Sequence, residues 1–174
     1  DLGIALVPED RKRHGAMLGI SIKNNINMPI YERTARLSVI NSKLEMETAQ
    51  KYQKSMAIKT PTLNQLVKNL SGGNQQKVIL ARWLAADSEL IIFDEPTRGI
   101  DVGAKYEIYK LMNDLVEKEG KAILMISSEM EELMGMSDRI VVLSEGVMTG
   151  ELNKSEFNQE TIMAYASAAR MEEG

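Results

Sequence analysis

Several kinds of residue and segment are absent or scarce in this 174-residue sequence, and each absence excludes something. There is no cysteine, which excludes disulfides and cysteine-based metal sites and makes a reducing compartment the expected one. No apolar run approaches the ~18 residues that a membrane-spanning helix needs, and the first residues do not resemble a signal peptide. Hydrophobic residues make up 44% and charged residues 26%, as in ordinary globular chains, so we expect one domain, or one core with a small subdomain.

Charge is distributed unevenly along the chain. Residues 1–70 carry eleven lysines and arginines against six acidic residues, whereas residues 71–174 carry ten against nineteen. Two differently solvated surfaces explain this distribution, and a basic surface that meets a partner is the sharper interpretation. The basic residues are scattered and aromatic residues are only 5%, so nucleic acid is not favoured as that partner.

Hydrophobic periodicity predicts an α/β fold with a parallel sheet. Two short apolar runs, Leu2–Val7 and Leu90–Phe93, have the composition of strands, and the second is typical of a parallel sheet buried on both faces. Residues 21–60 favour a mostly helical subdomain that begins with Ser21 as an N-cap and is interrupted by Pro29. Its main helix face would hold Leu44, Ala49, Tyr52 and Met56. Further helices are expected at 74–86, 129–136 and 158–171, and the clearest one is expected to run from its N-cap Asp101 as far as Gly120. Strands are expected at 122–126, 139–144 and 147–152, the last two joined by a hairpin turn at Glu145-Gly146.

The glycine-rich turn around Ser71-Gly72-Gly73 is a candidate anion site. It opens a predicted helix, whose first amides lack partners within the helix and point outward with partial positive charge. Glycines allow a phosphate to approach the backbone, and the Ser71 hydroxyl can add a donor. A helix entry whose glycines only satisfy turn geometry is the alternative, and these three residues alone do not decide between the two.

Two acids, Asp94 and Glu95, follow the second apolar run. In open α/β sheets, ligands bind at the carboxyl ends of the strands, where these side chains would emerge. One carboxylate there can hold Mg²⁺ through its water shell, and its neighbour can orient or deprotonate an attacking water. These are parts of a phosphoryl-transfer site, although a strand can end in two acids by chance.

Together, these segments resemble one family. Leu70–Gly73, Leu90–Thr97 and Gly99–Asp101 are similar, in order and spacing, to the signature motif, the Walker B motif and the D-loop of an ATP-binding-cassette (ABC) ATPase. The resemblance implies an α/β fold with a P-loop NTPase-like parallel sheet and an inserted helical subdomain. It narrows to the second cassette of bacterial monosaccharide importers of the ribose, galactose and xylose type through three further stretches: Asn74–Lys77, Arg98–Lys105 and Ser127–Met130.

The resemblance implies a role for each matching residue. Asp94 would hold the Mg²⁺ shell and Glu95 would be the catalytic base of ATP hydrolysis. Asp101 would cross the interface with a second cassette in a head-to-tail dimer, and Glu9 falls in the Q-loop, near the nucleotide. The residues that would bind the nucleotide held by that second cassette are Ser71, Gly72, Gly73, Asn74 and Gln75.

The resemblance also implies partners and a place in the cell. ATP would close the two cassettes and hydrolysis would reopen them. That motion would drive membrane permease subunits, which receive sugar from a periplasmic or extracellular sugar-binding protein. The chain would therefore be peripheral, on the cytoplasmic side of the cell membrane. We expect no residue of this chain to determine which sugar is transported.

Three departures from the family pattern shape these expectations. No G-x-x-x-x-G-K-[ST] motif, the P-loop or Walker A, occurs in the sequence. We therefore expect residues 1–174 to be the C-terminal part of a cassette, inactive alone, with a helical subdomain at 9–85, a core at 86–152 and a C-terminal helix at 153–174. Ser128 stands where the family usually has its switch histidine, and Glu9 stands where it has a glutamine. These two replacements suggest that this cassette lends its signature motif to a partner while its own site turns over poorly.

Two other functions share the same motifs. One is an ABC-type ATPase acting on DNA or the ribosome, which the acidic total, the absence of long heptads and the Ser127-Ser128-Glu129 variant do not favour. The other is a non-catalytic regulatory cassette.

Overall fold

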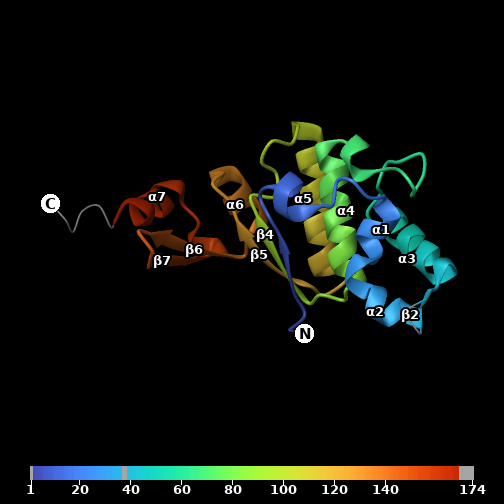
Figure 1. Cartoon of the computed structure of the whole chain (residues 1–174). Helices are drawn as coiled ribbons and strands as arrows, with labels where there is room; N and C mark the ends of the chain where they lie inside the picture. Colours follow the sequence, from blue (N-terminus) through green and yellow to red (C-terminus); the bar gives the residue numbers. More distant parts are fainter. Residues whose placement is uncertain (1, 37–38, 169–174) are drawn as a thin grey trace. The chain divides into compact units, whose positions relative to one another are not determined.

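The computed structural model describes residues 2–36 and 39–168, which form two compact units, Asp1–Ile126 and Ser127–Gly174 (Figure 1). We describe each unit by itself. The subdivision predicted from the sequence, with boundaries at residues 85 and 152, stays a prediction.

A three-stranded parallel sheet is the centre of the first unit and confirms the predicted α/β class. Its strands are β1 (Ile4–Val7), β4 (Leu90–Asp94) and β5 (Ala122–Ile126), in the order β1-β4-β5. Val7 pairs with Phe93, and Phe93 with Met125, so all three strands end at the same edge. The residues that follow each strand are therefore brought together there.

The two long helices α4 (Gly72–Ala85) and α5 (Val102–Glu117) lie on one side of this sheet (Figure 1). Ala5, Val7, Ile91 and Phe93 point toward them and are buried. On the other face, side chains of the described residues stay half exposed: Ile4, Leu6, Leu124 and Ile126. The predicted run 90–93 is therefore fully buried on one face and only partly buried on the other, because both covering helices of this unit lie on the same face.

Residues 21–60 are mostly helical, as predicted. Helix α1 (Ile22–Asn27) contacts both α3 (Ser42–Ser55) and α4, and Ser21 caps α1 by accepting the N–H of Asn24 at 3.1 Å. The shorter elements are η1 (Arg11–Gly15), η2 (Met28–Ile30), α2 (Tyr31–Thr34), β2 (Ala35–Arg36), β3 (Val39–Ile40) and η3 (Val67–Asn69).

A buried acid, rather than a continuous apolar stripe, holds α3 against its neighbours. Glu45 forms an ion pair with Lys23 of α1 and accepts the Tyr31 hydroxyl at 3.1 Å. Ala49 and Met56 are buried as predicted, but Leu44 is 40% exposed. The predicted face was wrong at this end of the helix because Glu45 occupies the inward position beside it.

The second unit is a β-hairpin with three helical segments. It contains α6 (Met130–Met136), β6 (Arg139–Ser144), β7 (Val147–Asn153), η4 (Lys154–Glu156) and α7 (Gln159–Ser167). The predicted turn is confirmed, because Glu145 and Gly146 both have positive φ, as a tight hairpin needs. The predicted last helix extends to residue 171, and its residues 169–171 lie outside the described part. Among the described residues, no helix is long and apolar enough to cross a membrane.

Candidate functional site

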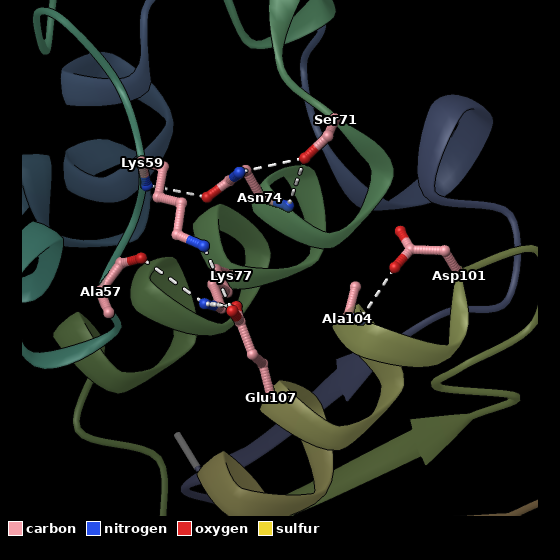
Figure 2. A network of polar contacts seen from close by, with 8 residues as sticks. All are labelled: Ala57, Lys59, Ser71, Asn74, Lys77, Asp101, Ala104 and Glu107. Atoms are coloured by element: carbon pink, nitrogen blue, oxygen red, sulfur yellow. Dashed lines mark hydrogen bonds and ion pairs between the residues drawn. The ribbon is translucent and has the colours of Figure 1, made fainter.

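The first group of predicted site residues lies at the start of α4. Ser71 is exposed and caps this helix, its Oγ accepting the backbone N–H of Asn74 at 3.5 Å. The side-chain amide of Asn74 donates to the same oxygen at 3.0 Å. A hydroxyl that two hydrogen bonds hold in place therefore lies at the start of α4 (Figure 2).

The start of α5 lies beside the start of α4. Asp101 caps α5 as predicted, its carboxylate accepting the Ala104 N–H at 3.0 Å. A Cβ placed on Gly73 would come within 3.2 Å of the Ala104 Cβ, so the two helices approach as closely as a glycine at this position allows. We call Ser71, Gly73, Asn74 and Asp101 the helix-end group.

Three charged side chains behind the helix-end group were not predicted from the sequence. Glu107 of α5 accepts from the Lys77 ammonium at 2.7 Å and from the Lys59 ammonium at 3.2 Å (Figure 2). The Lys77 side chain is only 6% exposed. Hydrogen bonds from Lys77, and secondarily from Lys59, hold the pKa of Glu107 below its usual value.

Gln75, predicted to contact nucleotide, is buried. Its side-chain amide donates to the carbonyls of Val67 and Leu70, at 3.3 and 3.2 Å. In this arrangement Gln75 holds the segment that leads into Ser71. A direct contact between Gln75 and nucleotide stays a prediction, as does one by Gly72.

The second group of predicted residues lies where the strands end. Asp94 is the last residue of β4 and is half-buried. Glu95 follows with φ of 47°, in the left-handed region that costs a residue with a side chain about 1–2 kcal/mol. The Glu95 N–H donates to the carbonyl of Ile126 at the end of β5, at 2.9 Å. Backbone strain of this kind concentrates at functional sites, which supports the assignment of this turn as part of one.

Glu9 joins Glu95 and Asp94 at this edge because β1 is parallel to β4. Its carboxylate forms an ion pair with Arg98, which comes from the turn after Glu95. The sequence left the Glu9 charge uncompensated, and the structure supplies Arg98 as its counter-ion. We call Glu9, Asp94 and Glu95 the strand-end group.

Ser128, at the position of the family's switch histidine, belongs to the second unit and is exposed. Its neighbour Ser127 contacts the Glu132 carboxylate and accepts the Glu129 N–H at 3.0 Å. This local turn holds the start of α6. A role for Ser128 in hydrolysis stays a prediction.

Among the site residues, Asp94 is the one predicted to contribute its carboxylate to a metal site. Within residues 2–36 and 39–168, no group of three or more acidic, histidine or cysteine side chains could enclose a metal ion. Mg²⁺ commonly binds through one or two carboxylates together with substrate phosphates and waters. Asp94, at the strand end, fits that pattern, in which the protein supplies only part of the metal's ligands.

The chain can be compared with known proteins on this basis. A family model described as ABC transporter matches residues 3–98, more than half of the chain. The xylose import ATP-binding protein of Thermoanaerobacter pseudethanolicus is 52% identical over 97% of this chain. The ribose import ATP-binding protein of Clostridium perfringens is 53% identical over 94% of it. The chain spans 33% of the length of each of these relatives, and the matched third is their C-terminal part.

Solved structures agree with the fold at lower identity. A dimeric ATP-binding cassette in a post-hydrolysis state, bound to ADP and Pi, matches with a TM-score of 0.72 and 23% identity, over 88% of this chain and 64% of that chain. The cbiO1 protein of Clostridium perfringens, part of an ABC transporter complex, matches with a TM-score of 0.74 and 20% identity, over 98% and 65%. The parallel sheet, the motif order and these matches agree: the chain belongs to the ABC transporter family of ATP-binding cassettes.

Proposed function

We propose that the chain acts as part of the ATP-binding subunit of an importer for a monosaccharide. The observation that carries the proposal is the helix-end group, in which the exposed Ser71 and Asp101 cap two adjacent helices held together at Gly73. Two capped helix starts side by side suit an anionic ligand brought by a partner. The choice of a monosaccharide as the transported substrate rests on the relatives, which are named for xylose and ribose import.

In the proposed reaction, the helix-end group faces the γ-phosphate of ATP bound by a second cassette. Ser71 donates a hydrogen bond to that phosphate, and Asp101 contacts the second cassette. At the chain's own site, Asp94 would hold Mg²⁺, which would neutralise phosphate charge there, and Glu95 would accept a proton from the attacking water. The phosphate-gripping P-loop, which is absent from these 174 residues, would come from another polypeptide segment.

The proposed partners follow from the same assignment. A second cassette would pair head to tail with this one, membrane permease subunits would receive the motion, and a sugar-binding protein would deliver the sugar. The chain would then work at the cytoplasmic side of the membrane as a peripheral component.

We further propose that the chain's own ATP site is the weaker of the two. Ser128 cannot reproduce the charge and reach of an imidazole. The Glu9 carboxylate, although paired with Arg98, is 43% exposed at the edge where phosphates would lie. Both features would slow hydrolysis at this site and leave the helix-end group intact for the partner's site.

A hybrid protein tests the proposed function. This chain replaces the corresponding third of the xylose import ATP-binding protein of Thermoanaerobacter pseudethanolicus, and ATP turnover is compared with that of the unmodified relative. We expect turnover within about tenfold of the relative, and a loss of about tenfold or more on Ser71→Ala, because one donor to the phosphate is removed. A folded hybrid that turns over ATP equally well with and without Ser71 would contradict the proposal.

A binding measurement on the isolated 174-residue chain is the complementary test. Without a P-loop, the chain should not bind Mg-ATP tightly by itself. Isothermal titration that gave a Kd below about 10 μM would show that the chain holds nucleotide without a partner segment, against the proposal.

A further inference from the structure

A chain of hydrogen bonds runs from Ser71 into the body of the first unit. The Ser71 oxygen accepts two N–H groups of Asn74, one from the backbone and one from the side chain (Figure 2). A hydroxyl oxygen has two lone pairs and one proton. With both lone pairs directed at Asn74, the Ser71 proton points away from it. Because Ser71 is exposed, that proton points toward solvent. Asn74 therefore sets the direction in which Ser71 can donate.

The orientation of the Asn74 amide is itself determined by a second contact. Its Oδ1 accepts the backbone N–H of Lys59 at 2.8 Å. A backbone N–H can only donate, so the oxygen of the amide must face Lys59 and the nitrogen must face Ser71. If the segment around Lys59 moved, the amide would lose the contact that holds it in this orientation.

Glu107 holds the Lys59 segment in place. Its two carboxylate oxygens accept from the side chains of Lys59 and Lys77, at 3.2 and 2.7 Å, so one acid of α5 joins that segment to α4. The Lys77 ammonium also donates to the carbonyl of Ala57, at 3.5 Å. Ala57 has φ of 47°, a left-handed conformation that turns the chain just before Lys59. The segment is thus tied at two points to a buried ammonium and to α5.

These contacts form a closed path between the two helix starts. It leads from Ser71 through Asn74 to Lys59, and from there through Glu107 into α5, which Asp101 caps. The two helices also approach closely at Gly73, where an added Cβ would come within 3.2 Å of the Ala104 Cβ. Separating or sliding the two helices would therefore disturb the hydrogen bonds that orient Ser71.

We propose that Asn74 and Glu107 are positioning residues, which direct the Ser71 hydroxyl proton outward and tie its position to α5. Ser71 and Asp101 then meet the partner cassette's nucleotide as one rigid unit. The proposal rests on the proposed function, because it concerns how Ser71 is presented to the phosphate. It adds that two residues acting through Ser71 govern the strength of that one hydrogen bond, and it gives Asn74 this role in place of the direct nucleotide contact expected from the sequence.

A double-mutant cycle in the hybrid protein tests the role of Asn74. We expect Asn74→Ala alone to lower ATP turnover about tenfold, because the Ser71 proton loses its fixed direction. In a Ser71→Ala background, the same change should cost less than about twofold, because coupled residues are not additive. If the two losses multiplied, Asn74 would act independently of Ser71 and the proposal would be wrong. If Ser71→Ala itself had no effect, the proposed function would fail instead.

A second variant separates the two contacts of Asn74. Asn74→Asp keeps an acceptor for the Lys59 N–H but has no N–H for Ser71, and its carboxylate would accept the Ser71 proton and turn it inward. We expect turnover at or below that of Asn74→Ala, measured at about 0.5 M salt so that repulsion between the carboxylate and phosphate is screened. Turnover near that of the unmodified hybrid would show that only the Lys59 contact matters, and would overturn the proposal even if Ser71→Ala left no measurable activity.

Glu107 is tested against an acid on the same helix. Glu107→Gln keeps the size of the side chain and removes its charge, and should lower turnover by about threefold to tenfold while the KM for ATP stays within about twofold. Glu117→Gln, on the same helix and outside the path, should leave both unchanged. Thermal unfolding of each hybrid shows whether it is folded. Equal turnover in the Glu107 and Glu117 variants would overturn the role of Glu107.

Discussion

The helix-end group and the strand-end group, proposed to serve the partner's ATP site and the chain's own, are held by the protein in different ways. In the helix-end group, Ser71 and Asn74 are joined by hydrogen bonds, with the nearly buried Lys77 ammonium behind them. In the strand-end group, Glu9 is 43% exposed and its partner Arg98 is 66% exposed. The Lys77–Glu107 pair therefore has one nearly buried member, whereas both members of the Glu9–Arg98 pair are exposed, and an exposed ion pair of that kind is worth only about 0–1 kcal/mol.

This difference suggests a division of labour. The helix-end group is complete and preorganised in the chain alone, as a surface that is offered to a partner should be. The strand-end group has three acids at one edge, of which Glu9 pairs with Arg98, and the sequence contains no P-loop motif. Under the proposed function, such a group would need a P-loop from another polypeptide segment and a cation before it could hold a polyphosphate. If the two groups differ in this way, substitutions in them should have effects of different size and kind on ATP turnover and on stability.

The largest effect is expected at Gly73. Because a Cβ at this position already comes within 3.2 Å of Ala104, the larger side chain of Gly73→Leu should push α4 and α5 apart. We expect ATP turnover of the hybrid to fall by about 100-fold or more, since a displacement of about 1 Å can cost that much.

Gly135→Ala is the matched control, because no atom lies within 4 Å of a Cβ added there. It replaces a glycine within a helix and should leave turnover unchanged. If Gly73→Leu retained most of the turnover, the close approach of the two helices would have no functional meaning, and the contrast between the groups would weaken.

The next effect compares two ion pairs. Lys77→Ala leaves Glu107 with one partner fewer and removes a side chain that is 6% exposed, so we expect the free energy of unfolding of the chain to fall by about 2 kcal/mol. Arg98→Ala removes an exposed pair and should change it by less than about 0.5 kcal/mol.

Urea denaturation of the isolated chain at neutral pH measures both changes. A larger loss from Arg98→Ala would mean that the strand-end pair is the structural one, and would reverse the comparison.

The two groups also differ in how far the sequence could predict them. Caps act over three residues, so Ser21 and Asp101 could be assigned from their neighbours alone, and both cap their helices. Ser71 also caps a helix, which begins at Gly72 rather than at the predicted residue 74. Similarly, a four-residue apolar run that ends in two acids is local, and Asp94 does end a parallel strand. The edge at which the strand-end group gathers follows from the parallel order of the strands.

Contacts between distant segments could not be predicted in this way. Lys59 and Glu107 are 48 residues apart, and Glu9 and Arg98 are 89 apart. Each pair depends on how a helix or strand packs against another, and this packing cannot be deduced from the local patterns of a single sequence. The half-exposed sheet face was missed for the same reason, because an apolar strand looks alike whether helices cover one of its faces or both.

A smaller effect is expected for Glu95→Gln. If this cassette's own site is the weaker one, replacing its proposed base should lower turnover of the hybrid by less than about twofold, since the partner's site supplies most of the rate. The measurement is steady-state ATP turnover, with the base of the other cassette changed in a parallel variant. A collapse as large as that of the parallel variant would show that both sites are needed, and the proposed asymmetry would be wrong.

The smallest expected effect is a change in folding stability at acidic pH. Hydrogen bonds from Lys77 and then Lys59 lower the pKa of Glu107 in the folded chain, so ionised Glu107 favours folding. That stabilisation is fully present above about pH 4.3, the usual pKa of an unfolded glutamate, and is lost as the pH falls through the lower, folded value. Glu107→Gln cannot titrate and lacks this loss.

Because the Glu107 side chain is 45% exposed, the expected difference between the two proteins is small, at most about 0.5 kcal/mol. Urea denaturation at pH 7 and at pH 3 measures it. The unmodified chain should lose more stability between these values than Glu107→Gln does, and the other carboxylates cancel in the comparison. Parallel losses in the two proteins would mean that Lys59 and Lys77 do not hold Glu107 in solution as they do in the structure. The helix-end group would then be no better anchored than the strand-end group.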